Sequence, residues 1–171
     1  MTAPAEGRST TSAAALRFVR MDASTRPAAE ALLGAFLDQD EHYRATADAY
    51  GDGGRPALAR ALELFLAHPE IGFVWLGRTE AGEAVAACVA CHAISTSRGA
   101  LVAKLDDVTV AAGWQGRGVG SRLLDSLAAH LRARGFGRID TACHRDNTGA
   151  WRFYARLGFQ PLDEQRLARL L

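Results

Sequence analysis

Residues 115–120 spell QGRGVG, so three glycines alternate with other residues directly ahead of an amphipathic run. In that run Leu123, Leu124 and Leu127 fall on one face of a helix. Glycine has no Cβ, so a ligand can contact the main-chain N–H groups of such a loop directly. The first turn of a helix also carries N–H groups without an intrahelical partner, and its dipole favours anions. The segment therefore predicts a loop and helix start that either bind a phosphate group or form a tight turn.

The sequence on both sides of this loop predicts one sheet of mixed direction. Residues 71–78, 84–95 and 100–112 are apolar and β-tolerant, with turn residues between them, and they predict an antiparallel meander. After the loop, a helix over residues 120–134 leads to a strand at 138–144, which can pair in parallel through that crossover. This order of elements favours the α/β class, with helices flanking a single twisted, mixed sheet.

The N-terminal part of the chain predicts a strand and two amphipathic helices. We expect the strand at 16–22, a helix that begins at Ser24 or Thr25, a loop at 50–56 and a second helix that stops before Pro69. A proline disfavours helix at the residue before it, which is why the second helix should stop there.

The C-terminal part predicts one more helix and two short strands. Asp146 or Asn147 is expected to cap a helix that runs to Leu157. Residues 159–162 and 166–171 then predict the two strands.

Composition limits the class of protein and its partners. The chain has 171 residues, enough for one domain with its own core, and 20 basic against 19 acidic residues give a formal net charge of +1. We therefore expect no nucleic-acid partner and no membrane partner. Residues 1–14 predict a disordered tail ahead of a domain at 15–171. Three cysteines, an odd number without a secretory signal, favour reduced thiols and a cytoplasmic location.

Two nucleotide-binding motifs fail at individual residues. A P-loop needs a lysine and then Ser or Thr after its last glycine, but no lysine follows Gly118 or Gly120. A dinucleotide fingerprint that began at Gly116 would need glycine or alanine where Ser121 stands.

The segment CVACH at 88–92 has the spacing of a c-type haem attachment site. It lies inside an apolar strand, which would point Cys88 and Cys91 to opposite faces of the sheet. A zinc site would need two further ligands. We therefore expect no haem and no metal.

Two motifs in the second half of the chain resemble one family. QGRGVG resembles the Gln/Arg-x-x-Gly-x-Gly/Ala motif of the GNAT superfamily of acyl-CoA N-acyltransferases. Residues 147–159, NTGAWRFYARLGF, resemble the family's second signature of Asn, Ala, Phe-Tyr and Gly-Phe. Residues 104–120 are similar to the diamine (spermidine/spermine) acetyltransferase type. The resemblance implies a bulged strand splayed from its parallel neighbour, and acetyl-CoA as co-substrate with no metal.

The spacing of apolar residues in the third meander strand supports that bulge. Leu105, Val108 and Val110 cannot all lie on one face of a regular strand, so a β-bulge near Asp106 and Asp107 is expected, an unbroken strand being the alternative. The resemblance implies that a main-chain N–H near Val108 would stabilise the oxyanion of acyl transfer.

The resemblance assigns the coenzyme to the main chain of the glycine loop and its neighbours. Arg117 and Arg122 would add charge for the phosphates or lie idle on the surface. The residues expected to bind coenzyme A are Val108, Val110, Gln115, Gly116, Arg117, Gly118, Val119, Gly120, Ser121, Asn147 and Tyr154.

Three residues are candidates for the chemistry. Asp106 and Asp107 would accept a proton from the amine, directly or through water, or would hold its charge; the alternative is two solvated acids. Tyr154 matches the family's general acid for the leaving thiolate, the alternative being a core aromatic residue. A phenol and a thiol have comparable ordinary pKa values, so this proton transfer is expected to be nearly balanced.

The acceptor is expected to be a primary amine, such as a polyamine or an amino acid, that attacks the thioester directly in a ternary complex. Glu41, His42 and His92 are the candidates for its binding, with the acidic run from Asp38 as a source of attraction or a solvated loop. The alternatives are a protein N-acetyltransferase and a non-catalytic acyl-CoA sensor. A small-molecule acceptor and a homodimer are the partners expected.

Overall fold

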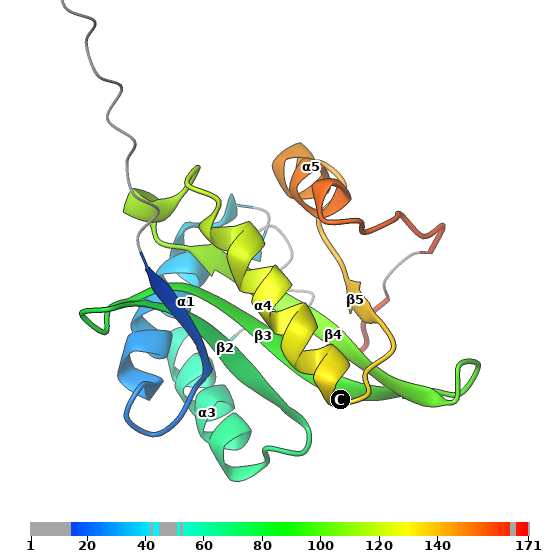
Figure 1. The fold of residues 1–171 in the computed structure, drawn as a ribbon, viewed down its shortest axis with the longest axis horizontal. Helices are drawn as coiled ribbons and strands as arrows, with labels where there is room; N and C mark the ends of the chain where they lie inside the picture. The colour runs from blue at the N-terminus through cyan, green and yellow to red at the C-terminus, as the bar shows by residue number, and fades with distance from the viewer. Residues whose placement is uncertain (1–14, 42, 45–50, 52, 165–166, 171) are drawn as a thin grey trace, which may run out of the picture.

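A computed structural model describes residues 15–41, 43–44, 51, 53–164 and 167–170. They contain one five-stranded sheet in the order β1-β2-β3-β4-β5, in which the first three pairings are antiparallel and the last is parallel (Figure 1). The strands are β1 (Leu16–Arg20), β2 (Gly72–Thr79), β3 (Ala84–Ser95), β4 (Ala100–Val110) and β5 (Ile139–Thr141). The predicted meander of β2, β3 and β4 is confirmed, and the tail predicted at 1–14 lies outside the described residues.

Helices cover both faces of this sheet. On one face lie α1 (Arg26–Gln39) and α3 (Gly54–Ala67), and on the other α4 (Val119–Ala133), as Figure 1 shows. A short 3₁₀ turn, Ala112–Trp114, follows β4, and α5 (Thr148–Arg156) follows β5. The predicted α/β fold with a single mixed sheet is confirmed.

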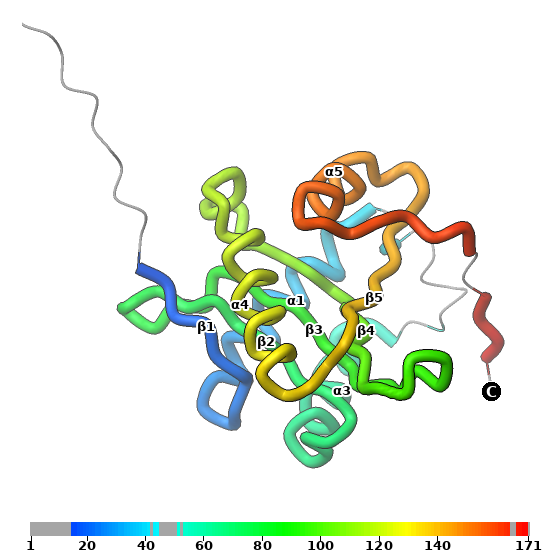
Figure 2. The backbone as a smooth tube through the Cα atoms, turned by 45° about the vertical axis from the view of Figure 1, so that its right-hand side comes forward, coloured from blue at the N-terminus to red at the C-terminus, as the bar shows by residue number. Residues whose placement is uncertain are grey.

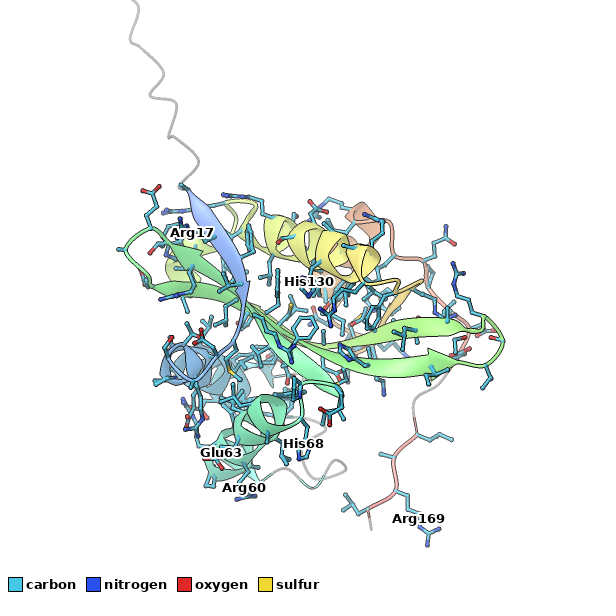
Figure 3. All side chains as sticks on the ribbon, turned by 60° about the horizontal axis from the view of Figure 1, so that its bottom comes forward. Arg17, Arg60, Glu63, His68, His130 and Arg169 are labelled. Carbon is cyan, nitrogen blue, oxygen red and sulfur yellow. The ribbon has the colours of Figure 1, made fainter. Side chains whose placement is uncertain are left out.

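Two apolar clusters, one on each face, hold these layers together. Alternate residues of β2 contribute to both: Phe73 and Trp75 join the cluster under α4, whereas Val74 and Leu76 join the cluster under α1 and α3. Because β2 is buried on both sides, it lies in the centre of the core. His130 of α4 stacks on Trp75 with ring centroids 4.6 Å apart, and Figure 3 shows it between the helix and the sheet. Burial lowers the pKa of His130, which keeps this ring neutral.

Two predicted segments differ in extent from the structure. The strand expected at 138–144 is reduced to Ile139–Thr141. The loop expected at 50–56 ends sooner, because α3 begins at Gly54 and takes Pro56 into its first turn, where a missing N–H costs no helical bond.

The two C-terminal strands are not formed. Residues 159–162 and 167–170 carry no strand, and their leucines stay exposed, Leu162 at 66 % and Leu167 at 90 %. Pro161 lacks the N–H that a strand ladder needs, and the leucines have no face of the sheet to cover.

Candidate functional site

A β-bulge interrupts β4 where the spacing of apolar residues predicts it. Val89 pairs with Asp106 and Ala87 pairs with Thr109, so two steps along β3 match three steps along β4. Asp107 has φ of 50°, the one positive value at a non-glycine residue in the described chain, and aspartate tolerates this left-handed conformation better than most residues. The predicted bulge near Asp106 and Asp107 is confirmed.

β4 and β5 part at the bulge. Their parallel pairing covers three positions, from Ala103 with Ile139 to Leu105 with Thr141, although β4 continues to Val110. After these strands the chain leaves in two directions, toward the start of α4 and toward α5 (Figure 2). At the last paired position the Thr141 hydroxyl donates a hydrogen bond to the Leu105 carbonyl over 3.0 Å.

The extra residue also decides which way the main chain beyond the bulge faces. Ala103 donates its N–H toward the β5 side, to the Arg138 carbonyl, whereas Ala111 donates toward the β3 side, to the Val85 carbonyl, both over 2.9 Å. Strand alternation then turns the N–H groups of Val108 and Val110 away from β3. They face the side on which the pairing with β5 has ended.

The glycine loop follows directly and opens α4. Gly116 and Gly118 have φ of 70° and 72°, and a Cβ on either would meet nothing within 4 Å. These glycines therefore serve a left-handed backbone on an open surface. Gly118 is the N-cap of α4, which receives no side-chain cap, so the main-chain donors of its first turn are not used by a capping side chain.

Gly120 has a different role from the other two glycines. A Cβ there would lie 3.3 Å from the Phe153 ring of α5 and 3.5 Å from Cγ2 of Val110. The missing side chain lets α5 approach both the start of α4 and the end of β4. Glycine at this position thus fixes the packing of the site rather than its backbone conformation.

The polar side chains near the loop already have partners within the protein. Gln115 Nε2 donates to the Val110 carbonyl over 3.0 Å. The guanidinium carbon of Arg117 lies 5.7 Å from the centroid of the Trp114 ring, and that of Arg122 lies 5.8 Å from the Phe18 ring. The Arg117 side chain therefore stays near the glycine loop, where the sequence predicts that it could contact a phosphate. The Arg122 side chain packs on β1 instead.

Tyr154 reaches the same region from α5. Asn147 caps this helix by accepting a hydrogen bond from the Ala150 N–H over 2.9 Å, which confirms one of the two predicted caps. The Tyr154 ring lies between those of Phe153 and Phe159, each with its centroid 5.2 Å away. The Thr141 side chain at the end of β5 is among the groups that influence its ionisation.

Burial dominates the ionisation of Tyr154. It raises the pKa of the phenol to about 12, with the hydrogen bond from Thr141 acting in the opposite direction. The phenol pKa therefore lies above the ordinary value on which the expectation of a nearly balanced transfer rests. An ordinary thiol has a pKa of about 8.5, so moving the proton from Tyr154 to a thiolate is uphill by roughly 3 to 4 pKa units.

The two aspartates lie at the bulge and are both half-buried. The charge of Asp106 adds to the effect of burial in raising the pKa of both Tyr154 and Cys91. The structure therefore brings Asp106 into the electrostatic surroundings of Tyr154, although the two residues are 48 positions apart in the sequence.

The candidate acceptor residues are not gathered at the bulge. Glu41 is exposed beyond the end of α1, and His42 lies outside the described residues. His92 pairs with Ala103, toward the other end of β4, and its Nδ1 donates to the Glu70 carbonyl over 2.8 Å. Its ring packs on Phe136, with centroids 4.9 Å apart.

Part of the acidic run has a structural use. The Arg55 Nε donates to the Asp38 carboxylate over 3.1 Å, which holds the pKa of Asp38 below its usual value. Asp40 accepts a hydrogen bond from the Tyr43 N–H over 2.7 Å. These two carboxylates therefore have structural partners, which neither alternative, amine attraction or a solvated loop, predicted.

The cysteine motif behaves as strand geometry predicts. Cys88 is fully buried in the cluster under α4, while Cys91 packs with the opposite cluster. Among the described residues, no group of three or more His, Cys, Asp or Glu side chains is arranged to hold a metal ion. None of the helices in that part of the chain is long and apolar enough to cross a bilayer.

Two surface hollows lie away from the bulge. One, of about 280 Å³, lies between the ends of β1 and β2 and includes Arg17 and Arg78. The other, of about 440 Å³, lies beside His92, Arg134 and Phe136 at the C-terminal end of α4. Neither has the glycine loop in its lining.

The comparison with known families decides the assignment that the bulge, the glycine loop and Tyr154 suggest. Residues 34–159 match the model of the Acetyltransferase (GNAT) family. The chain belongs to this family. No curated protein matches the sequence.

Solved structures agree with the GNAT fold. A transcriptional regulator from Bacillus halodurans C-125 superposes with a TM-score of 0.73 at 18% identity, covering 91% of this chain and 100% of the other. An aminoglycoside acetyltransferase from an uncultured soil metagenomic sample gives 0.68 at 19%, covering 92% and 99%. A ribosomal-protein-alanine N-acetyltransferase from Brucella melitensis biovar Abortus 2308 gives 0.70 at 13%, covering 91% and 99%. At such identities the likeness establishes the fold alone, so the resemblance to the diamine type stays a prediction.

Proposed function

We propose that this GNAT protein transfers an acetyl group from acetyl-CoA to the amino group of a small primary amine. The observation that carries the proposal is the meeting of three features at one end of the sheet. β4 is bulged and parted from β5, an uncapped helix start follows it, and Tyr154 lies against the last residue of β5.

The chain's own groups fit a coenzyme in two places. The exposed loop 115–118 and the first turn of α4 suit a pyrophosphate, because left-handed glycines leave their main chain open and no side chain caps the helix. Val108 and Val110 present main-chain donors and acceptors on the parted side of β4, which suit the amide groups of a pantetheine arm. Acetyl-CoA would supply the activated acyl group.

Each catalytic role follows from where its residue lies. The neutral amine is the nucleophile, so Asp106 or Asp107 accepts a proton from the ammonium form, directly or through water. The Val108 N–H stabilises the oxyanion. Tyr154, whose pKa of about 12 keeps it protonated at neutral pH, donates to the leaving thiolate.

The acceptor is argued from the charge of the carboxylates that the sequence singles out. Asp106 and Asp107 at the bulge, together with Glu41, are proposed to attract a cationic amine. A polyamine, another small amine or an amino acid satisfies this requirement. The proposal places His92 outside the acceptor site, because it pairs with Ala103 and packs on Phe136.

The decisive experiment measures release of the coenzyme A thiol. The protein is incubated with acetyl-CoA and a panel of polyamines, amino acids and other primary amines, and free thiol is titrated with time. Amine-dependent release supports the proposal. Tight binding of acetyl-CoA with no release for any amine, or release with peptide amino groups alone, would instead favour the sensor or the protein acetyltransferase.

A matched pair of glycine variants tests the coenzyme site separately. Gly118→Ala places a Cβ on a left-handed residue at a cost of about 1–2 kcal/mol, and we expect coenzyme A affinity to fall about tenfold. Gly113→Ala is the control, because its φ is not positive and its Cβ would meet nothing within 4 Å. Equal calorimetric affinities for the two variants would remove the glycine loop from the binding site.

A further inference from the structure

Lys104 is the only lysine among the 20 basic residues of the chain, the rest being arginine. It lies on β4, ahead of the bulge, where the register with β3 is regular. There Lys104 pairs with Cys91, and two residues further on Asp106 pairs with Val89. Paired residues share a face, and both of these β3 residues pack in the cluster under α1 and α3 (Figure 1). Lys104 and Asp106 therefore both lie on the α1 and α3 face of the sheet.

The proposed acid lies on the other face. Leu105, between Lys104 and Asp106 in the sequence, is buried in the cluster under α4, and Tyr154 packs against that cluster. Successive residues of a strand point to opposite faces, so Asp106 points away from the side on which Tyr154 lies. An amine that gives its proton to Asp106 therefore approaches the thioester from the face that carries Lys104.

The fold makes no use of the Lys104 charge. The side chain is exposed, and it forms no ion pair with any residue that the structure describes. Its neighbour across β5 is Asp140, but Arg138 holds both oxygens of that carboxylate. The Arg138 Nε lies 2.6 Å from one oxygen, and Nη2 donates to the other over 2.9 Å. Lys104 therefore presents its positive charge to solvent, two residues from the half-buried Asp106.

We propose that Lys104 selects an acceptor that carries a carboxylate beside its reacting amine, so that the substrate class is an amino acid. The inference rests on the proposed acetyl transfer. Asp106 attracts the ammonium group and accepts its proton, while Lys104 binds the carboxylate and takes no part in the transfer of the acyl group. Two steps along a strand span about 7 Å, and the flexible stem of lysine lets its ammonium meet a carboxylate at several distances from Asp106.

The same charge acts against a polyamine. A polyamine that placed one ammonium group at Asp106 would bring its next cation toward Lys104, and like charges repel. An amino acid brings an anion to the same place. The pair of Lys104 and Asp106 thus both favours a zwitterion and disfavours a dication, which is how specificity between related ligands is usually obtained.

The test compares each amino acid that supports thiol release with the amine that lacks only its carboxylate. The smallest such pairs are glycine with methylamine, β-alanine with ethylamine and γ-aminobutyrate with propylamine. We expect Lys104→Met to lower kcat/KM for the amino acid about five- to tenfold, since an exposed contact between charged groups is lost. The value for the matched amine should stay within about twofold. Lys104→Arg keeps the charge and should stay within about threefold for both.

Two controls separate this contact from a general effect of charge. Arg132→Met removes an exposed cation from α4, on the opposite face of the sheet, and should leave kcat/KM unchanged for both members of a pair. Acetylation with N-hydroxysuccinimidyl acetate uses the fact that the chain has a single lysine. The reagent should lower turnover of the amino acid by the parent protein but not by Lys104→Arg, which has no ε-amino group. Equal losses in the two proteins would count against Lys104.

The outcomes distinguish the two proposals. A parent protein that acetylates amino acids, and whose Lys104→Met variant loses no preference for them, overturns the role of Lys104 alone. The same holds if the parent protein acetylates polyamines or other amines but no amino acid, because the acetyl transfer then stands without the selection. A parent protein that releases no thiol with any acceptor overturns the acetyl transfer, and the role of Lys104 with it.

Discussion

The two halves of β4 belong to one strand but use their main chain differently. From Ala100 to Leu105 three residues are buried, Val102, Ala103 and Leu105, and the last three positions pair with β3 and β5 at once. From Asp106 to Val110 every residue is half-buried, and the pairing recorded is with β3 alone. One inserted residue, at Asp107, separates a half that pairs with strands on both sides from a half that pairs with β3 alone.

The largest expected effect is on stability in the paired half. Leu105 is fully buried, so Leu105→Ala should lower the free energy of unfolding by about 3–4 kcal/mol, counting lost burial and the cavity. Val108→Ala, in the half-buried part, should cost about 1 kcal/mol or less. Urea unfolding of both variants measures the contrast. Similar losses for the two would mean that the halves are equally packed.

The next effect is on catalysis beside the parted half. Tyr154→Phe keeps the ring contacts with Phe153 and Phe159 and removes the hydroxyl. We expect kcat to fall about 100-fold, the lower end of what a general acid contributes. Thiol release gives the rate, and urea unfolding checks that stability has changed little. An unchanged kcat would make Tyr154 the core aromatic residue of the alternative interpretation.

The bulge itself can be tested through its left-handed residue. Asp107→Val puts a β-branched side chain at φ of 50° and should cost about 1–2 kcal/mol of stability, together with weaker coenzyme A binding as the bulge relaxes. Asp107→Gly suits that conformation and should keep stability and binding. Calorimetric titration with coenzyme A compares the affinities of the two variants. Equal affinities would show that the bulge does not set the binding geometry.

The smallest effect is a pH dependence of stability. Because burial raises the pKa of Tyr154 to about 12, the folded state holds a proton that the unfolded state loses near pH 10. This contribution to stability is intact below pH 10 and declines as the pH rises toward 12. The loss at pH 11 is about 1 kcal/mol. The parent protein should therefore lose about that much more stability than Tyr154→Phe between pH 8 and pH 11. Parallel losses in urea unfolding would mean that Tyr154 titrates as an exposed phenol.

Much of the candidate site could be predicted because its signals are local. The spacing of Leu105, Val108 and Val110 indicated the bulge, since a strand has only two faces. Asn147 before a helical run indicated a cap, because only a short polar side chain can reach the first free N–H groups. Gly116 and Gly118 indicated an open loop, since glycine adopts positive φ at little cost.

Other parts of the site depend on elements that are distant in the chain. The Thr141 hydroxyl donates to the Leu105 carbonyl, and no spacing around Thr141 suggested this contact. Likewise, Arg122 packs on Phe18 because α4 crosses β1. The His92 side chain is hydrogen-bonded to the Glu70 carbonyl, and its ring packs on Phe136. The prediction of two C-terminal strands failed for the same reason, because whether a segment becomes a strand depends on the presence of a partner edge.

By itself, the sequence determined the order of the strands and helices, the place of the bulge and the open helix start. These depend on the conformations that a few neighbouring residues allow, and such preferences act wherever the segment lies. The tertiary structure alone decided that Tyr154 of α5 packs in the same apolar cluster as Val108 and Val110 of β4. It also set the pKa of Tyr154, because burial and hydrogen-bond partners come from residues that only folding brings together.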